Sequence, residues 1–480
     1  MNKHRSAIKD IVKVAFSRGV SLFSGVVVGL LLPKLLSVAD YGHLKIYTLY
    51  IAYTALLHFG FVDGILLHLA GKNYEQLQRT HIRAYTRFFI GFQFTVGAAL
   101  SLCGLWASDA HYRFILLMLG IHMVIINLTT YYQFVSQATQ RFTEYAARSF
   151  MLSLLKTAFV VLLLFLHLSK TALISYRLYI IGLTVIDGLL LLWYIWTYRD
   201  ITFGKSSPLR ECKNALLSLF KQGIVLTVAY QVSHLVFALD RQFVSLLYST
   251  ETYAHYSFAY NLVTMVSTMI ASLSVVLLPM LKKASAAYIH RHYNQVLAII
   301  SVLVGGSLIG YYPLAMFIRW FLPDYETSIR YLQIVLPALM YSCCISVVMF
   351  TFCKALDQNL RFFWNSCIAL GIGLLTNGFA QLLYGTPEAI SYASLLTMML
   401  WFWIEGQHLS RIVRSKIGKE FLYLSLLALG FILNTQLISS LWLGMLVYAL
   451  CLVALTLAFY HDFLRQFVKK RFSRSENAHG

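Results

Sequence analysis

The chain has 480 residues, of which 59% are hydrophobic and only 12% are charged, and its formal net charge is +20. A soluble domain has about 45–50% apolar and about 25% charged residues, so a soluble core cannot accommodate this surplus of apolar side chains. The Lys and Arg residues lie in short gaps between long apolar runs, where they orient a chain in a membrane. We therefore predict an all-α integral membrane protein with no nucleic-acid partner.

Fourteen apolar runs follow one another along the chain, each close to the ~20 residues that a helix needs to cross a bilayer. Six precede the longest polar gap, from Arg199 to Asn214, six follow it, and a pair closes the chain. The predicted spans are 11–33, 44–70, 84–107, 112–137, 148–168, 173–198, 218–240, 256–280, 294–319, 330–352, 362–384, 388–410, 421–437 and 442–460. We expect about fourteen transmembrane helices.

Lys and Arg are distributed unevenly between the two sides of the predicted membrane. Alternate gaps, beginning with the N-terminal segment, hold 27 of these residues, whereas the opposite gaps hold 8. Cytoplasmic loops of membrane proteins carry the excess of Lys and Arg. Both termini are therefore expected in the cytoplasm.

An internal repeat relates the first six spans to the next six. The segment SVADYGH (Ser37 to His43) is similar to STETYAH (Ser249 to His255), at an offset of 212 residues. The same offset carries each of the first six spans onto or near one of the next six, which indicates a duplicated six-helix lobe. Because six is even, both copies have the same orientation, as in parallel-repeat transporters that bind substrate between their lobes.

This repeat predicts the domain organisation, and it favours a transporter. The predicted parts are a first lobe at 1–198, a cytoplasmic linker at 199–214, a second lobe at 215–410, two additional transmembrane helices at 411–460 and a basic cytoplasmic tail at 461–480.

Four ionisable side chains lie inside predicted spans, where charges are costly and are functional candidates. They are Arg18, Asp63, Lys156 and Asp187, all in the first lobe, and the positions 212 residues later carry no charge. Arg and Lys are the side chains that bind anionic groups, so Arg18 and Lys156 are candidate substrate-binding residues for an anionic head group. Asp63 and Asp187 are candidates for charge partners or for ion coupling.

The depths of these residues predict two ion pairs, Arg18 with Asp63 and Lys156 with Asp187. In each pair the carboxylate holds its cation in the empty carrier and yields it to the substrate. The alternative is that the pairs only hold helices together, which is common in membrane bundles.

Two polar stripes are candidates for a cavity wall that offers hydrogen-bonding groups to a polar substrate. The seventh span carries Thr227, Tyr230, Gln231, His234 and Arg241 at helical spacing, and the fourth span carries Asn127 and Tyr131. The alternative is hydrogen bonding between helices.

Catalysis and metal binding have no recognisable signature in the sequence. The seven cysteines show no metal-ligand spacing and no disulfide framework, and no phosphate-binding Gly-Lys loop is present. We predict no catalytic residue, no metal and no cofactor.

Three segments resemble polysaccharide-unit flippases of the multidrug/oligosaccharidyl-lipid/polysaccharide (MOP) exporter superfamily. They are LLPKLLSVADYG (Leu31 to Gly42), which follows Arg18 in the first span, FGFVDGILLHLAGKNY (Phe59 to Tyr74) and LDRQFVSLLYSTETYAHYSFAYNL (Leu239 to Leu262). The likeness covers the whole chain in span number and duplication, but its motifs lie mostly in the first 75 residues. His68 departs from the pattern, because a basic residue is expected there in this subgroup.

The resemblance implies two six-helix lobes around a central cavity, two extra helices and a place in the bacterial cytoplasmic membrane. It also implies flipping of a polyprenyl-pyrophosphate-linked oligosaccharide from the cytoplasmic to the outer leaflet by alternating access. The implied partners are this lipid-linked glycan, membrane lipid and other membrane proteins of polysaccharide assembly.

Three other functions stay open at this point. A multidrug antiporter for organic cations would need an unpaired acidic cavity, whereas the first lobe carries two cations and two carboxylates. A membrane glycan polymerase or glycosyltransferase would need a long external loop or an acidic metal site. The third alternative is a scaffold that has lost transport.

Overall fold

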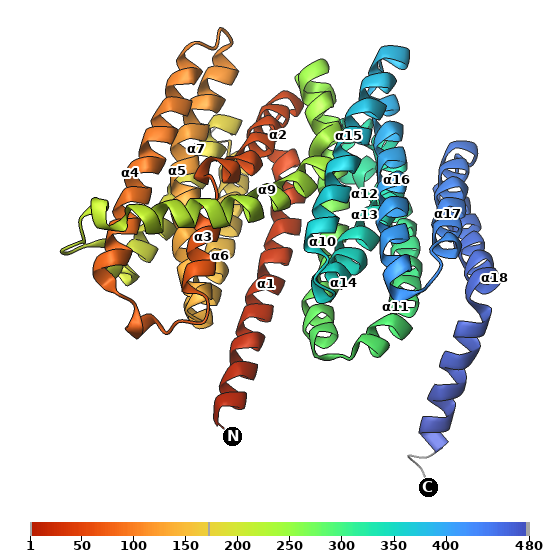
Figure 1. Cartoon of the computed structure of the whole chain (residues 1–480). Coiled ribbons are helices and arrows are strands. Elements are labelled where there is room, and N and C mark those ends of the chain that lie inside the picture. The colour runs from red at the N-terminus through yellow and green to blue at the C-terminus, as the bar shows by residue number, and fades with distance from the viewer. Residues whose placement is uncertain (1, 171–172, 477–480) are drawn as a thin grey trace. The chain divides into compact units, whose positions relative to one another are not determined.

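The computed structural model describes the backbone of residues 2–170 and 173–476; the side chains at 2–16, at Arg18, at six positions between 275 and 286 and beyond 461 lie outside the described residues. The described residues form helices and no strand (Figure 1). The α-helices are α1 (Asn2–Leu35), α2 (Val38–Tyr53), α3 (Phe61–Leu69), α4 (Arg79–Leu105), α5 (Ala110–Ala138), α6 (Phe142–Leu168), α7 (Tyr176–Thr197), α8 (Arg199–Thr202), α9 (Leu209–Leu247), α10 (Thr250–Lys283), α11 (Ala286–Ser307), α12 (Tyr311–Phe321), α13 (Ser328–Cys343), α14 (Phe350–Ala355), α15 (Asn359–Tyr384), α16 (Pro387–Val413), α17 (Gly418–Leu437) and α18 (Leu441–Glu476).

Each predicted span overlaps one of these helices or a pair of consecutive ones, so the all-α membrane architecture with about fourteen spans is confirmed. Among the described residues, ten helices are long and apolar enough to cross a membrane on their own, and α2 with α3 adds an eleventh if the bent pair is one span. Large apolar side chains such as Leu162, Phe165 and Leu189 are exposed, as lipid-facing positions require.

The chain divides into two compact units. The first contains residues 1–234 and 249–254, and the second contains residues 235–248 and 255–480. α9 is one continuous helix that contributes Leu209 to His234 to the first unit and its remaining residues to the second. The packing assigns residues 209–234, the first part of α9, to the first unit. The predicted boundary between the lobes, a linker at 199–214, stays a prediction.

The first unit is built from hairpins of long helices, with α4 packed on α5, α5 on α7 and α1 on α6 (Figure 1). Small residues let α1 and α6 approach closely. The Ser24 hydroxyl of α1 donates to the Ser153 carbonyl at 3.0 Å and lies 2.5 Å from the Thr157 hydroxyl, both on α6. The small-residue face of the first span is therefore a packing surface.

The second span is broken in its middle, which the sequence did not reveal. α2 passes into a short 3-10 helix, Thr54–His58, and α3 then leaves at an angle of 58°. Phe59 and Gly60 both have left-handed backbones, with φ of 50° and 82°. Glycine adopts this conformation readily, whereas Phe59 holds it at some cost.

Three glycines bring the backbones of α3 and α9 into contact. A Cβ at Gly60 would lie 2.1 Å from the Ile224 nitrogen, and one at Gly223 would lie 1.8 Å from the Gly60 oxygen. A Cβ at Gly64 would lie 2.1 Å from the Leu219 oxygen. Only glycine permits this crossing, which places Asp63 of α3 beside α9.

In the second unit, the ninth span changes pitch next to Pro313. The 3-10 turn Leu308–Gly310 separates α11 from α12, and Pro313 lies in the first turn of α12. Proline lacks the N–H that would bond the carbonyl four residues earlier, here Ile309. A π-helical turn, Cys344–Met349, interrupts the tenth span in a similar way.

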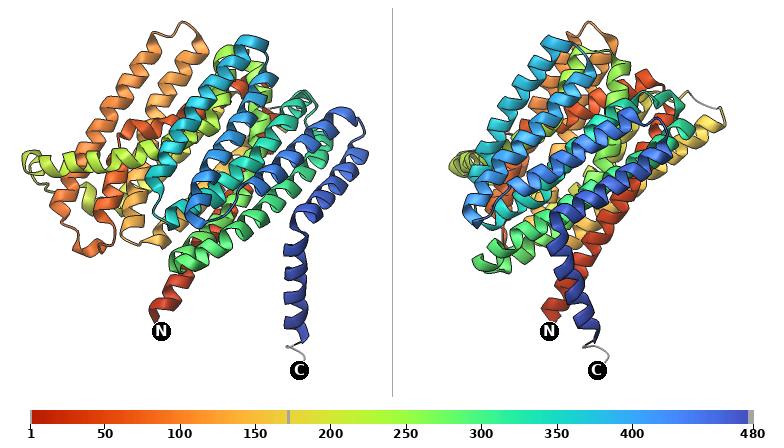
Figure 2. Two further views of the ribbon diagram at one scale, coloured as in Figure 1. Left: turned by 45° about the vertical axis from the view of Figure 1, so that its right-hand side comes forward. Right: turned by 90° about the vertical axis from the view of Figure 1, so that its right-hand side faces the viewer.

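The last two helices, α17 and α18, form a hairpin that packs on α11, α12 and α13 within the second unit (Figure 2). Asn434 of α17 accepts a hydrogen bond from the Tyr312 hydroxyl of α12 at 2.8 Å, and Tyr448 of α18 donates to the Gly305 carbonyl at 3.0 Å. These bonds attach α17 and α18 to α11 and α12.

Candidate functional site

Lys156 and Asp187 form the ion pair that their depths predict. Lys156 Nζ on α6 lies 3.1 Å from Asp187 Oδ1 on α7. The Lys156 side chain is 32% exposed, whereas that of Asp187 is 11% exposed. The cation can therefore reach the surface of the unit, while the carboxylate is held among the helices.

A histidine extends this pair into the interior of the unit. Asp187 Oδ2 lies 2.9 Å from His122 Nε2 of α5, and His122 Nδ1 lies 2.5 Å from the Tyr47 hydroxyl of α2. Sequence reasoning missed His122 and Tyr47. The available signal was His122 itself, an ionisable group within a predicted span.

Arg18 is the other predicted head-group ligand, and its side chain lies outside the described residues. Its helix is placed, and α1 packs on α6, the helix that carries Lys156. The pairing of Arg18 with Asp63 therefore stays a prediction.

Asp63 has described partners of its own. Thr227 of α9 donates a short hydrogen bond to Asp63 Oδ2, and His58 Nε2 lies 3.9 Å from the same oxygen. The Asp63 residue is 8% exposed. The carboxylate is thus held at the α3–α9 crossing, next to the break in the second span.

Three amides bind backbone carbonyls around this break. Asn127 of α5 donates to the Thr54 carbonyl, Gln93 of α4 to the Leu57 carbonyl and Gln231 of α9 to the Ala52 carbonyl, each at 3.2 Å. A broken helix leaves carbonyls without partners, and lipid offers none. The polarity of Asn127 and Gln231 is explained by this task.

The predicted stripe of the fourth span lies inside the first unit. Asn127 also donates to Gln93 Oε1 at 2.9 Å, and the Tyr131 hydroxyl lies 2.7 Å from that of Thr86. Tyr131 is fully buried against the rings of Phe61 and Phe89. These contacts are hydrogen bonds between helices, and a place of either residue on a cavity wall stays a prediction.

The polar residues of the predicted stripe on the seventh span differ in burial, and they belong to two different units. Thr227 and Gln231 are buried against α3 and α2, whereas Tyr230 and His234 are exposed. Arg241 belongs to the second unit, where its guanidinium donates to the Phe237 carbonyl at 2.9 Å and lies over the Tyr260 ring. Tyr230 and His234 are the exposed members of this stripe in the first unit.

The second unit has buried carboxylates that the sequence reading missed. Asp240 accepts hydrogen bonds from the hydroxyls of Tyr256, at 2.9 Å, and Tyr260. Glu405 is fully buried, and its oxygens accept from Asn365 Nδ2 at 2.7 Å and from Cys353 Sγ at 3.0 Å. Buried carboxyl groups are therefore not confined to the first lobe, where the four predicted side chains lie.

The predicted cytoplasmic end of the first unit is tied together by arginines. Arg83 donates to the carbonyls of Asp200 and Lys205 at 2.7 and 3.0 Å, and Arg87 donates to the Gly204 carbonyl at 2.5 Å. The Tyr74 hydroxyl donates to Asp200 Oδ1 at 2.6 Å. The segment after α8 is thus fixed to the start of α4.

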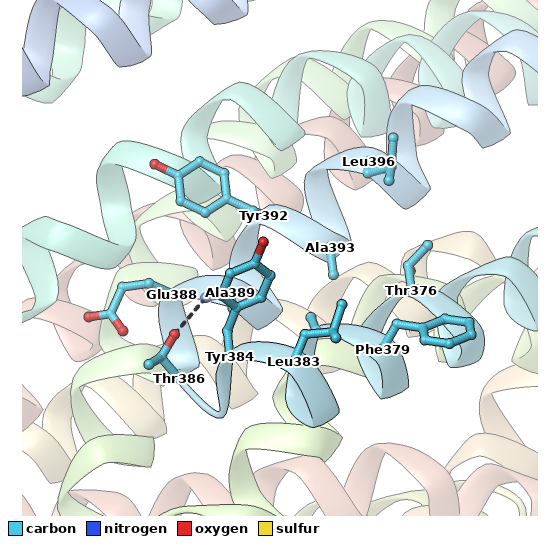
Figure 3. Close-up of a pocket in the computed structure, with 11 residues that line it drawn as sticks. Thr376, Phe379, Leu383, Tyr384, Thr386, Glu388, Ala389, Tyr392, Ala393 and Leu396 are labelled. Carbon is cyan, nitrogen blue, oxygen red and sulfur yellow. Dashed lines mark hydrogen bonds between the residues drawn. The ribbon is translucent and has the colours of Figure 1, made fainter.

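An apolar groove lies along the α15–α16 hairpin of the second unit (Figure 3). Its volume is about 660 Å³. Phe379 and Leu383 of α15 and Leu396 of α16 line it, and Tyr392 and Glu388 lie toward the hairpin turn. None of the predicted site residues lies in this groove.

Metal binding has no support in the described part of the chain, which contains no cluster of His, Cys, Asp and Glu that could hold an ion. All seven cysteines are free thiols.

Comparison with solved structures shows which fold this is. The chain is similar to the lipid II flippase MurJ in an inward closed conformation, with a TM-score of 0.68 and 16% identity, over 95% of this chain and 100% of that one. It is also similar to an inward-facing multidrug resistance MATE family transporter of the MOP superfamily, with a TM-score of 0.58 and 13% identity, over 85% and 99% of the two chains. A mutant of the MATE transporter VcmN from Vibrio cholerae gives a TM-score of 0.51 at 13% identity, over 87% and 100%.

Sequence comparison gives a narrower result. No curated protein sequence matches the chain. The family described as "Polysaccharide biosynthesis protein" matches residues 10–285, which is more than half of the chain. The protein therefore belongs to the polysaccharide biosynthesis protein family, and it has the fold of MOP-superfamily transporters.

Proposed function

We propose that the protein flips polyprenyl-pyrophosphate-linked oligosaccharide repeat units from the cytoplasmic to the outer leaflet, for the synthesis of a surface polysaccharide. The transport works by alternating access in the bacterial cytoplasmic membrane. Family membership supports the polysaccharide pathway, and the transporter fold supports movement of a substrate across the membrane.

The observation that carries the proposal is the position of Lys156. Its side chain extends from a membrane-spanning helix and is one-third exposed, and its ammonium group lies 3.1 Å from one carboxylate oxygen of Asp187. A pyrophosphate offers several anionic oxygens to such a point charge. The substrate can therefore compete with Asp187 for the cation, and Arg18 is the proposed second ligand.

The test is deletion of the gene and complementation with variants. Deletion should make lipid-linked repeat units accumulate on the cytoplasmic leaflet. Lys156→Gln should reproduce this accumulation at wild-type protein levels, whereas Lys170→Gln, an exposed cation just beyond the end of α6, should not. Unchanged surface glycan together with lost drug resistance would indicate the organic-cation antiporter instead.

The proposed orientation has a separate test. In a cysteine-free background, a cysteine at the exposed position Glu75 should react only with reagents that enter the cytoplasm, and one at the exposed position Ser108 should react from outside. The reverse pattern would invert the topology and the direction of transport.

A further inference from the structure

Four side chains from four helices of the first unit form one continuous polar chain. Lys156 contacts Asp187 at 3.1 Å, Asp187 contacts His122 at 2.9 Å and His122 contacts the Tyr47 hydroxyl at 2.5 Å. Lys156 is accessible at one end, whereas the His122 side chain is 4% exposed and Tyr47 is 1% exposed. The network thus connects an accessible cation to a buried histidine.

The carboxylate at the centre has two neighbours that can carry a positive charge. While Lys156 is in contact, Asp187 is balanced and a neutral His122 suffices. When Lys156 turns to an anionic ligand, the buried Asp187 loses the counter-ion that Lys156 provides, which is strongly unfavourable. His122 can restore the balance by taking up a proton, because a protonated imidazole is a cation and its Nε2 already lies 2.9 Å from Asp187 Oδ2.

The contacts of His122 accept both of its charge states. A neutral ring can donate from one nitrogen and accept from a hydroxyl at the other, and a protonated ring donates from both. Asp187 Oδ2 accepts from Nε2, and the Tyr47 hydroxyl can either donate to Nδ1 or accept from it. Protonation therefore requires only rotation of one hydroxyl hydrogen.

The groups that face His122 come from every helix around it. α2 contributes Tyr47, α7 contributes Asp187 and the nearby Tyr179, and α6 contributes Lys156 through Asp187. Among the described residues, the ion pairs of Asp187 are those with Lys156 and His122. The α4 residues next to this part of α5 are Gly97 and Ser101, which do not titrate.

We infer that His122 is a proton-binding site linked to substrate binding: proton uptake at His122 replaces Lys156 as the counter-ion of Asp187 and releases Lys156 to the pyrophosphate. The inference rests on the proposed function, because it assumes that Lys156 binds an anionic head group. Linkage is reciprocal, so a lower pH strengthens binding of the anion and the anion promotes protonation. The carrier thus binds its substrate and one proton together.

The experiment uses the full-length protein in lipid nanodiscs and farnesyl pyrophosphate as the probe. Its Kd is measured from pH 5.5 to 8 for wild type, His122→Gln and the control His167→Gln, an exposed histidine near the end of α6. If one proton is taken up on binding, Kd rises by up to about tenfold for each unit by which the pH increases through the range where that proton is lost. Wild type and the control should show this slope, and His122→Gln should lose it. The probe titrates alike in all samples, so only the difference between variants is read.

The outcomes separate the two proposals. Equal binding by wild type and Lys156→Gln would overturn the proposed head-group role, and the inference with it. Binding that requires Lys156 but keeps its pH slope in His122→Gln would overturn the inference alone.

A second measurement does not depend on the folding of His122→Gln. Calorimetry of the wild type in two buffers of different ionisation enthalpy counts the protons taken up on binding, after correction for the probe. We expect uptake approaching one proton near the midpoint of the slope, and no uptake would overturn the inference. Tyr47→Phe should shift the midpoint of the slope without removing it.

Discussion

Thr227 on α9 donates a hydrogen bond to Asp63 on α3, although 164 positions separate them in the chain. The bond crosses the glycine contact between the two helices and satisfies a carboxylate that is nearly buried. A buried acceptor that loses its donor is destabilised by about 1–3 kcal/mol. This bond is therefore a specific determinant of how α3 and α9 cross.

Replacement of Thr227 by Val should lower the free energy of unfolding by about 1–3 kcal/mol, because Asp63 loses its donor. Asp63→Asn should remove most of this sensitivity, since a neutral amide tolerates burial better than a charge. Thermal unfolding of both single variants and the double variant measures the coupling. Thr130→Val is the matched control, because Thr130 bonds only the Ile126 carbonyl of its own helix. A coupling near zero would contradict the prediction.

Gly223 should not tolerate alanine. The added Cβ would meet the Gly60 oxygen at 1.8 Å, a backbone atom that cannot move aside without separating the helices. Overpacking of this kind costs about 1–3 kcal/mol, which unfolding in detergent can detect. Gly91→Ala on α4 is the control, because its Cβ would meet nothing within 4 Å and alanine favours a helix. Equal stability of the two variants would show that the crossing is loose.

Arg148 should be more important to the fold than its neighbour Arg141. Its guanidinium is buried, bonds Glu144 Oε2 at 2.6 Å and the Thr197 hydroxyl at 2.5 Å, and lies over the Tyr194 ring. Arg148→Lys should lower the melting temperature, because an ammonium cannot make these planar contacts together. Arg141→Lys, at a partly exposed position, should have little effect. A larger loss at Arg141 than at Arg148 would contradict this placement.

Asp109 should make stability depend on pH. Its carboxylate accepts hydrogen bonds from the backbone N–H groups of Tyr112 and His111 at the start of α5, and that of Tyr112 contributes most to lowering the pKa of Asp109. A lowered pKa stabilises the fold at pH above the unfolded value, and this contribution is lost as the pH falls through the folded value. The stability advantage of wild type over Asp109→Asn should therefore be smaller at pH 3 than at pH 5.

A third variant, Asp109→Ala, is the control for the loss of the helix cap itself. Asp109→Ala removes the cap in both charge states, so it should be less stable than Asp109→Asn at either pH. An advantage of wild type over Asp109→Asn that is equal at pH 5 and pH 3 would show that the charge of Asp109 does not contribute.

The spans could be predicted from sequence because membrane helices need long apolar runs, and the Lys156–Asp187 pair could be predicted because depth along a helix follows from residue count. The break at Gly60 could not, because Phe59 and Gly60 interrupt no apolar pattern. Its position depends on the glycine contact with Gly223, which only tertiary packing creates.

The partners of Tyr47 and Arg148 could not be predicted from the sequence for a similar reason. Tyr47 becomes a partner of His122 only when α2 and α5 pack, and nothing in its sequence position indicates this. Arg148 counts in the sequence as an ordinary cation of a cytoplasmic gap, and its burial depends on the aromatic rings of α7. Short-range patterns identify where helices are, whereas side-chain partners depend on which helices meet.

The break in the second span constrains which residues can be substituted on the helices around it. Asn127, Gln93 and Gln231 lie on three different helices, and each donates to a carbonyl of the same short segment. A variant in which α2 and α3 formed one straight helix would use those carbonyls itself, and the three buried amides would lose these acceptors. Conversely, apolar replacements of the amides would be tolerated only together with a straightened second span. Substitutions at these positions of α2, α4, α5 and α9 are therefore expected to occur together. Related chains should have both the break and the three amides, or neither.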